Sequence, residues 1–398
     1  MHSSTDAFSQ FELMNEAFRQ VLKPIEQARG LPNQIYTDDH AHAYECRNVL
    51  ARDWACIGFT KDIAKPGDAF PIDFAGYPLL MVHGRDDTIR VFHNVCRHRG
   101  RTLVETPTHL KSAIVCPYHC WTYGLDGRLI GAPHVGGVGK HDCPGFDKNN
   151  IRLSEVRSAV WFGMIFVDLS GEAGTFDDHI APVRARWHDF EGVPLVHTGD
   201  DSTITFTLDC NWKLAVENYC EAYHLPWVHP GLNDYSPLER HTPIVESRYS
   251  GQISECYNPS FPEGAPAFPS APGLPAYWDH GAEYLCLFPN VLLGVHRDHF
   301  FAGLIVPDGP GKTREQFELF YFDPAVADDA YAPSRAANRA LWQSVFAEDQ
   351  DAVEAMQRGR RSPGFDGGVF SPVMDPPTHS FNIWIAQAWL HASGATAS

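Results

Sequence analysis

Two short segments of the chain each carry one cysteine and one histidine that can bind a metal. Cys96 and His98 stand in the first segment and Cys116 and His119 in the second, with the spacing C-x-H-x17-C-x-x-H. Two thiolates on one iron and two imidazoles on the other can hold a binuclear iron–sulfur cluster. Because imidazoles are neutral, such a cluster has a reduction potential of about −150 to +300 mV, above that of the all-cysteine type. The spacing therefore predicts an electron-transfer cluster.

A structural zinc site is the alternative for two cysteines and two histidines. Structural zinc sites usually take like ligands from one short segment, two cysteines together and two histidines together. Here each segment supplies one residue of each kind, which favours the iron–sulfur cluster. Pro117 stiffens the second segment, and a hairpin turn is predicted after it at Asp126 and Gly127.

A second group of metal-binding side chains stands further along the chain. Glu217, Glu221 and His224 follow one another at helical spacing, which would place them on one face of a helix. Pro226 is expected to end that helix, so that His229 turns back toward His224. Two histidines and a carboxylate on one side of an iron form the triad of non-haem iron oxygenases. An ordinary solvated helix face is the alternative interpretation.

The carboxylate of this triad must come from another segment, and residues 344–354 contain four acids. On a helix, Asp349 would neighbour Val345 and Phe346, which makes it the one acid within the apolar stripe. Asp351 would lie on the solvated face instead. An acid on a core-facing stripe needs a partner, and a metal can supply it. Asp349 is therefore the predicted third ligand.

Together, the two groups resemble the terminal oxygenase α subunits of the Rieske non-haem iron oxygenases. The electron-transfer Rieske proteins of respiratory complexes, which are the alternative of another class, carry two further cysteines that bridge the cluster loops. Here the first segment has no second cysteine. Such carriers also lack a site like that of His224 and His229. Cys120, where many family members have glycine, is interpreted as a small buried thiol.

The resemblance implies an α+β fold with two domains. We expect a helical N-terminal arm over residues 1–45, packing on the catalytic domain, and a Rieske-type β domain over 46–168. Residues 169–398 are expected to form the helix-grip catalytic domain, an antiparallel sheet flanked by helices. Residues 160–167 are predicted to close the Rieske domain as one buried strand. Three further segments are predicted strands of the catalytic domain: 283–288, 300–306 and 316–322.

The resemblance also implies two cofactors, a [2Fe–2S] cluster and Fe(II). The cluster ligands would be Cys96, His98, Cys116 and His119, and the iron ligands His224, His229 and Asp349. In the family, an acid three residues before the first iron histidine connects it to a cluster histidine of the neighbouring subunit, and Glu221 holds that position. Members with glutamate there act on quaternary ammonium compounds such as carnitine, betaines and stachydrine. Glu217 stands where ring dioxygenases often have Asn or Gln.

The expected activity is oxygenation of a small molecule with O2. Because no dinucleotide-binding fingerprint is found in the sequence, electrons should come from a separate flavin and iron–sulfur reductase that uses NAD(P)H. We expect monooxygenation and N-demethylation of a betaine-like quaternary ammonium substrate. Hydroxylation, dihydroxylation or O-demethylation of an aromatic acid is the alternative. The family also implies a homotrimer, with electrons crossing between subunits.

Composition sets further limits on function. A length of 398 residues suits two domains with substantial cores. The net charge of −18 argues against nucleic-acid binding and suits a cationic substrate. No apolar run is long enough to span a membrane, and the polar N-terminus does not resemble a signal peptide. The ten cysteines show no paired spacing, so a reducing cytoplasm is the expected location.

Overall fold

The computed structural model describes residues 4–260 and 262–395, with only the backbone of residues 4–12. The chain divides into two compact units. The small unit comprises Ala51–Ala173, and the large unit comprises Met1–Leu50 together with Gly174–Ser398. The N-terminal segment thus belongs to the large unit. The small unit begins and ends five residues after the boundaries of 46 and 168 expected from the sequence.

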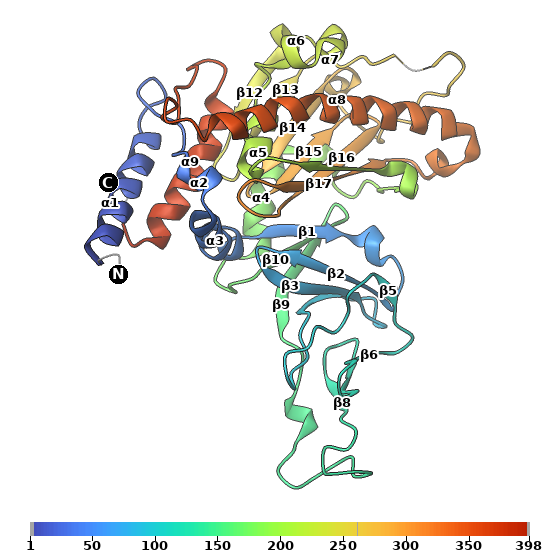
Figure 1. Ribbon diagram of the computed structural model, residues 1–398. Coiled ribbons are helices and arrows are strands. Elements are labelled where there is room, and N and C mark those ends of the chain that lie inside the picture. The colour runs from blue at the N-terminus through green and yellow to red at the C-terminus, as the bar shows by residue number, and fades with distance from the viewer. Residues whose placement is uncertain (1–3, 261, 396–398) are drawn as a thin grey trace. The chain divides into compact units, whose positions relative to one another are not determined.

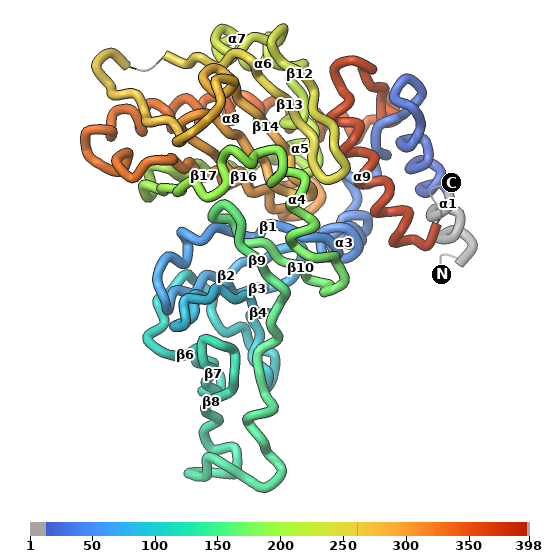
Figure 2. Tube along the Cα trace, turned by 180° about the vertical axis from the view of Figure 1, so that it is seen from behind, coloured from blue at the N-terminus to red at the C-terminus, as the bar shows by residue number. Residues whose placement is uncertain are grey.

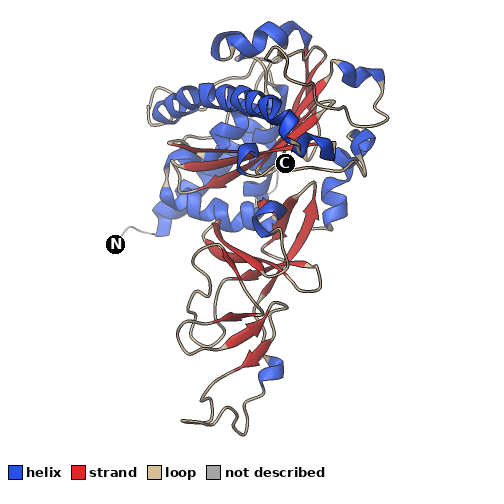
Figure 3. Ribbon diagram, turned by 90° about the vertical axis from the view of Figure 1, so that its right-hand side faces the viewer, coloured by secondary structure: helices blue, strands red, loops and turns tan. Residues whose placement is uncertain are grey.

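The small unit is built from antiparallel strands and loops, with only short helical turns between them (Figure 3). One sheet has the strand order β1 (Ala55–Phe59), β10 (Met164–Asp168), β9 (Glu155–Trp161), β4 (Ile89–His93), β3 (Tyr77–His83), β2 (Asp68–Phe74) and β5 (Thr108–His109). A second sheet comprises β6 (Ala113–Val115), β7 (Thr122–Gly124) and β8 (Leu129–Gly131). Phe92, Ile114 and Tyr123 are fully buried in a core that also includes Cys96 and Cys116. The cysteine-bearing loops are therefore anchored in the core of this unit.

The segment 160–167 is a hairpin, so the prediction of a single strand is wrong. β9 ends at Trp161 and β10 begins at Met164. Between them, Phe162 and Gly163 have φ angles of 46° and 72°. Two successive positive φ angles are typical of a type I′ turn, whose twist matches that of the strands it joins. The unbroken apolar run hid this turn, because Phe162 stands where Asn or Asp usually marks it.

The large unit contains a single seven-stranded antiparallel sheet. Its order is β11 (Thr203–Leu208), β17 (Thr313–Tyr321), β16 (His299–Pro307), β15 (Val291–Val295), β14 (Ala282–Leu287), β13 (Tyr249–Ser254) and β12 (His241–Val245). Every residue of β14, β15 and β16 is buried. This burial explains the continuous apolar runs in the sequence. The predicted strands at 283–288, 300–306 and 316–322 are confirmed as β14, β16 and β17.

Helices cover this sheet, and the longest of them, α8 (Ala332–Gly359), runs along it (Figure 1). α5 (Trp212–Cys220) packs on β13, β14 and β16 and also against α8 and α9 (Pro376–Ala392). α1 (Ser4–Val21) lies beside α9 (Figure 2). The other helices are α2 (Gln34–Thr37), α3 (Asp39–Asn48), α4 (Phe176–Arg186), α6 (Leu225–Val228) and α7 (Pro230–Tyr235). Within the described residues, no helix combines the length and apolarity that a membrane span requires.

A buried ion pair ties α5 to the N-terminal segment of the large unit. Lys213 and Glu45 are both fully buried, and Lys213 Nζ lies 2.8 Å from Glu45 Oε2. The same ammonium donates to the Ile35 carbonyl at 2.9 Å, and the Trp212 indole donates to Glu45 at 2.8 Å. Because every charge here has partners, the cost of burying the ions is offset. The pair fixes where α5 sits on the sheet.

Glu217 belongs to the same buried region and does not face the metal site. Its carboxylate accepts hydrogen bonds from the Tyr36 hydroxyl, from Asn382 Nδ2 at 3.0 Å and from Arg360 at 3.4 Å. These partners come from three other helical segments of the large unit. The expected alignment of Glu217 with the iron-ligand face is therefore wrong. The next residue, Asn218, lines the cavity beside the iron site instead.

We expect Lys213→Met to lower the free energy of unfolding by about 3–5 kcal/mol, because it leaves the Glu45 carboxylate buried without its cation. Denaturant unfolding followed by circular dichroism measures this change. The control is Arg19→Met, which breaks the exposed pair with Glu16 and should cost less than about 1 kcal/mol. Equal effects of the two substitutions would contradict a role for the buried pair. The double variant Lys213→Met/Glu45→Gln should recover part of the loss, since no unpaired charge then remains.

Candidate metal centres

The four predicted cluster ligands lie in two loops of the small unit that share one backbone pattern. In the first loop the Gly100 amide donates to the Cys96 carbonyl, and in the second the Cys120 amide donates to the Cys116 carbonyl, each at 3.0 Å. Gly100 and Cys120 both have positive φ angles, 74° and 54°. Each loop thus turns tightly after its cysteine and presents a histidine two or three residues later.

Cys120 is exposed, so its interpretation as a buried thiol is wrong. It occupies the left-handed position of its loop, where glycine has no steric penalty and other residues are uncommon. The backbone turn determines this position, and its side chain faces solvent. A buried environment could not be read from the neighbouring residues, because the turn reverses the direction of the chain here.

The four side chains fit a [2Fe–2S] cluster. Cys96 and Cys116 are each only 2% exposed, and burial raises the pKa of the Cys96 thiol. The His98 and His119 rings lie 4.7 Å apart between centroids. His119 Nδ1 is buried and has no hydrogen-bond partner among the described residues. Because an orphaned imidazole nitrogen is costly to bury, it indicates a missing ligand at this point.

Neighbouring side chains hold these ligands in place. Cys96 Sγ lies 3.2 Å from the Tyr123 hydroxyl, which also accepts from the Arg97 amide at 3.0 Å. The His98 ring stacks on Trp121, with centroids 4.6 Å apart and planes 6° from parallel. A hydrogen bond to a ligand sulfur stabilises the charge of the thiolate and is one determinant of a cluster's potential.

The second metal site lies after the end of α5, not along it. α5 ends at Cys220, and Glu221 has an extended backbone. His224 immediately precedes α6, and His229 stands between α6 and α7. The expectation of one helix carrying Glu217, Glu221 and His224 is thus wrong. Pro226 lies in the first turn of α6, where proline is favoured, so it begins a helix rather than ending one.

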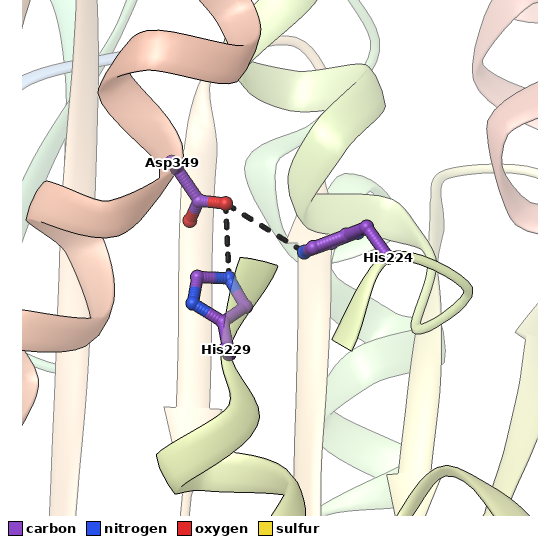
Figure 4. A group of neighbouring side chains, drawn as sticks. All are labelled: His224, His229 and Asp349. Carbon is purple, nitrogen blue, oxygen red and sulfur yellow. Dashed lines mark ion pairs between the residues drawn. The ribbon is translucent and has the colours of Figure 1, made fainter. Parts of the chain in front are cut away.

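His224, His229 and Asp349 converge on one point (Figure 4). Asp349 Oδ1 lies 2.9 Å from His229 Nε2 and 3.6 Å from His224 Nε2. One ligand atom of each residue lies within 4.8 Å of the others. Asp349 Oδ1 is buried, and apart from its approach to the two imidazoles it has no hydrogen-bond donor among the described residues. Two imidazole nitrogens and one carboxylate oxygen on one side of a cavity fit a non-haem iron with open coordination positions.

The way α8 is rotated about its own axis explains why Asp349 reaches this point. The Asp349 side chain is 22% exposed, whereas Asp351 is exposed on the opposite side of the helix. Phe346 and Val353, one turn before and after, are buried. The expected difference in burial between the two acids is confirmed.

Each iron-site histidine also contacts a second carboxylate through its other ring nitrogen. His224 Nδ1 lies 2.6 Å from Glu221 Oε1, and His229 Nδ1 lies 2.8 Å from Glu348 Oε2. Donation from Nδ1 leaves Nε2 free to bind a metal and fixes the ring orientation. Glu348 is one of the four acids of residues 344–354, and sequence reasoning did not identify its contact with His229. The available signal was its position directly before Asp349 on α8.

A cavity opens beside the three residues. Five aromatic side chains form much of its wall: Tyr219, Tyr284, Phe301, Trp342 and Phe346. Their polar atoms bond to the protein behind them. The Tyr219 hydroxyl donates to the Leu293 carbonyl at 2.7 Å, and the Trp342 indole donates to His299 Nε2 at 3.0 Å. These five side chains therefore offer ring surface rather than hydrogen-bonding groups.

The charged side chains of this wall are acidic. Glu221 and Asp349 line the cavity, and none of its lining residues in the described chain is Lys or Arg. Burial lowers the pKa of His241, another lining residue, and so disfavours its cationic form. Glu315 shares a neighbouring cavity with Asp349, and its burial, together with the Asp349 carboxylate, raises its pKa to about 8.

Comparison with known proteins places the chain in a family. Residues 185–390 match the ring hydroxylating alpha subunit (catalytic domain), and residues 53–142 match the Rieske [2Fe-2S] domain. The chain belongs to the Rieske non-haem iron oxygenases. This Rieske oxygenase is an oxidoreductase with a [2Fe–2S] cluster and a non-haem iron. A carrier without a catalytic domain, the alternative of another class, is excluded.

Relatives of this Rieske oxygenase carry monooxygenase names. It is 28% identical to the carnitine monooxygenase oxygenase subunit of Escherichia coli, over 86% of this chain and 87% of that protein. It is 28% identical to the chloroplastic choline monooxygenase of Arabidopsis thaliana, over 90% and 82%. Its fold resembles the crystal structure of the quaternary ammonium Rieske monooxygenase CntA with an inhibitor, at a TM-score of 0.77, 22% identity, and 93% and 98% coverage.

We expect Asp349→Ala to lose the mononuclear iron and all turnover while the cluster remains, because only two imidazoles are left at that site. Asp351→Ala is the matched control, because Asp351 lies two residues further along the same helix, and this variant should keep both metals. Iron analysis together with the visible absorbance of the cluster distinguishes the two sites. Exchange of the two phenotypes would contradict the assignment of Asp349.

A titration of the protein with iron tests the contribution of Glu348 to iron binding. Because Glu348 orients His229 without touching the metal, Glu348→Gln should weaken iron binding by about 10- to 100-fold rather than abolish it. Iron affinity equal to that of the unaltered protein would show that the contact at His229 Nδ1 is dispensable.

Proposed function

We propose that this chain is a terminal oxygenase that monooxygenates and N-demethylates a small quaternary ammonium substrate. The observation that carries the proposal is the aromatic and acidic wall of the cavity beside His224, His229 and Asp349. The relatives are named for carnitine and choline, and both are quaternary ammonium compounds. These names also support the proposal. The proposed iron ligands are these three residues, and the proposed cluster ligands are Cys96, His98, Cys116 and His119.

The wall suits a cation. Ring faces attract ammonium groups by about 0.5–2 kcal/mol each, most strongly where water is excluded. The Glu221 and Asp349 carboxylates balance the two positive charges of the proposed iron, so the site has no net positive charge that would repel the substrate cation. An aromatic acid would instead bring a carboxylate into a wall whose described residues include no cation, at a large desolvation cost. These two facts favour the quaternary ammonium over the aromatic acid.

The proposed reaction inserts one oxygen atom of O2 into an N-methyl C–H bond and releases the other as water. This consumes two electrons and two protons. The resulting hydroxymethyl ammonium group then breaks down to formaldehyde, a tertiary amine and a proton. The bound iron supplies the activation of O2, and the cluster supplies electrons to it. Glu221 and Glu348 orient the two histidines, and the aromatic wall places the methyl group beside the triad.

Electrons are proposed to come from a separate NAD(P)H reductase that carries a flavin and an iron–sulfur cluster. The absence of a dinucleotide fingerprint in the sequence supports this arrangement. The proposal includes a cytoplasmic location. None of the ten cysteines, all of which lie in the described part of the chain, forms a disulfide, as suits a reducing compartment.

The active assembly is proposed to be a head-to-tail homotrimer in which each cluster serves the iron of the next subunit. The cluster loops expose Tyr118 at 57%, and the iron-site segment exposes Trp227 at 71% and Tyr223 at 45%. Two different exposed apolar surfaces on one chain suit a heterologous contact, which forms a ring if the rotation closes. Glu221 is then the proposed electron connection between a neighbouring cluster histidine and His224.

Turnover of trimethylammonium compounds with a surrogate reductase tests the function. We expect formaldehyde, a tertiary amine and consumed O2 in equal amounts. Phe301→Leu should raise the KM for the cation about tenfold, because it removes one ring from the wall. Phe300→Leu is the control: the adjacent residue packs against Trp187 and Phe320 and does not line the cavity. Turnover of aromatic carboxylates but of no quaternary ammonium compound would reject the proposal.

Mixing two inactive variants tests the ring. Cys116→Ser removes the cluster and Asp349→Ala removes the iron, so neither homotrimer should turn over substrate. Mixed trimers should recover part of the activity, because an intact cluster can then face an intact iron across an interface. Verified mixed oligomers that show no recovery would mean that electrons stay within one chain.

A further inference from the structure

The charge at the far end of the substrate is a second property that the cavity restricts. Quaternary ammonium compounds fall into two groups. Zwitterions such as carnitine and glycine betaine carry a carboxylate, whereas choline carries a neutral hydroxyl. Both groups share the cationic end that the aromatic wall suits, so the wall alone does not distinguish them. The other groups that line the cavity do distinguish the two kinds of substrate.

The iron proposed at His224, His229 and Asp349 adds two positive charges, which the Asp349 and Glu221 carboxylates balance. Among the described side chains of the cavity, a carboxylate tail would find no cationic partner. The charged lining residues among the described ones are Glu221 and Asp349, both acidic. The imidazoles behind the wall do not supply positive charge either. His299 Nδ1 donates to Asp298 at 2.7 Å while its Nε2 accepts from Trp342, and burial lowers the pKa of His296 well below its usual value. A buried carboxylate without a partner is strongly disfavoured.

A neutral polar group would find a hydrogen-bonding partner in this cavity. Asn218, on α5, lines this cavity and also the neighbouring cavity beside Asp349. Its side-chain amide has no hydrogen bond to any residue in the described part of the chain. The other lining amide, Gln252, is already engaged, since it donates to the Glu221 carbonyl and accepts from His241. An amide can both donate to and accept from a hydroxyl, which makes Asn218 a suitable partner for one.

We propose that the substrate is a quaternary ammonium monocation with a neutral, hydrogen-bonding tail, and that the Asn218 amide binds this tail. The inference rests on the proposed function and narrows its substrate class from all betaine-like compounds to the non-zwitterionic ones. Here Asn218 contacts the tail, and the five rings contact the ammonium head beside the iron.

Three ligands of similar size separate the contributions of the tail. They are choline with a hydroxyl, glycine betaine with a carboxylate, and propyltrimethylammonium with a methyl group in place of the hydroxyl. Calorimetric titration of the metal-loaded protein without reductant measures their affinities. We expect choline to bind at least tenfold more tightly than glycine betaine, and about three- to tenfold more tightly than propyltrimethylammonium. Equal or tighter binding of glycine betaine would overturn the inference.

Two variants assign the effect to named residues. Asn218→Leu should bring choline and propyltrimethylammonium to equal affinity, while the affinity for propyltrimethylammonium remains. Leu232→Arg places a cation on the cavity wall at a partly buried position and should raise the affinity for glycine betaine above that for choline. A preference for choline that survives Asn218→Leu would overturn the role of Asn218.

The outcomes distinguish this inference from the proposed function. If glycine betaine binds best and yields formaldehyde, the proposed function stands and the inference fails. If none of the three ligands binds and an aromatic carboxylate is turned over, both fail.

Discussion

The iron site depends on one interaction, the donation of each histidine Nδ1 to a carboxylate. His224 bonds to Glu221 and His229 to Glu348, and this leaves both Nε2 atoms facing Asp349. An imidazole without that contact can rotate or change tautomer, and its ligand nitrogen then leaves the site. The two carboxylates come from segments far apart in the chain. The site therefore forms only when α8 and the segment after α5 pack in the correct position relative to each other.

Packing of the large unit maintains the relative position of α5 and α8. The buried pair of Lys213 and Glu45 holds α5 against the N-terminal segment, and the bonds of Glu217 hold it against the C-terminal helices. α8 is held by Trp342 and Phe346, whose rings pack on Phe301 of strand β16. These contacts also form the cavity wall. The residues that position the iron ligands therefore also shape the space where a substrate would bind.

The two metal sites use different means of fixing their ligands. The cluster ligands sit on tight loops, each closed by a backbone hydrogen bond and a residue with positive φ, and are anchored by the core of the small unit. The proposed iron ligands stand at the two ends of α6 and on α8, and side-chain contacts fix them. A cluster bound by loops can stand at the surface, where a partner can approach it. An iron bound between helices and a sheet can face a cavity with restricted access to water.

The sequence by itself identified the candidate ligands that the structure then brings together, because ligand types and their spacing reflect the demands of a metal. Strands β14, β16 and β17 and the burial of Asp349 on α8 also followed from local periodicity. Tertiary structure alone decided the end of α5 at Cys220, the hairpin at Phe162, the exposure of Cys120 and the inward turn of Glu217. In each of these cases the deciding partner lies far away in the sequence or is the backbone itself. Local patterns contain no information about such partners, and so Glu348, whose histidine is 119 residues distant, was found only in the folded chain.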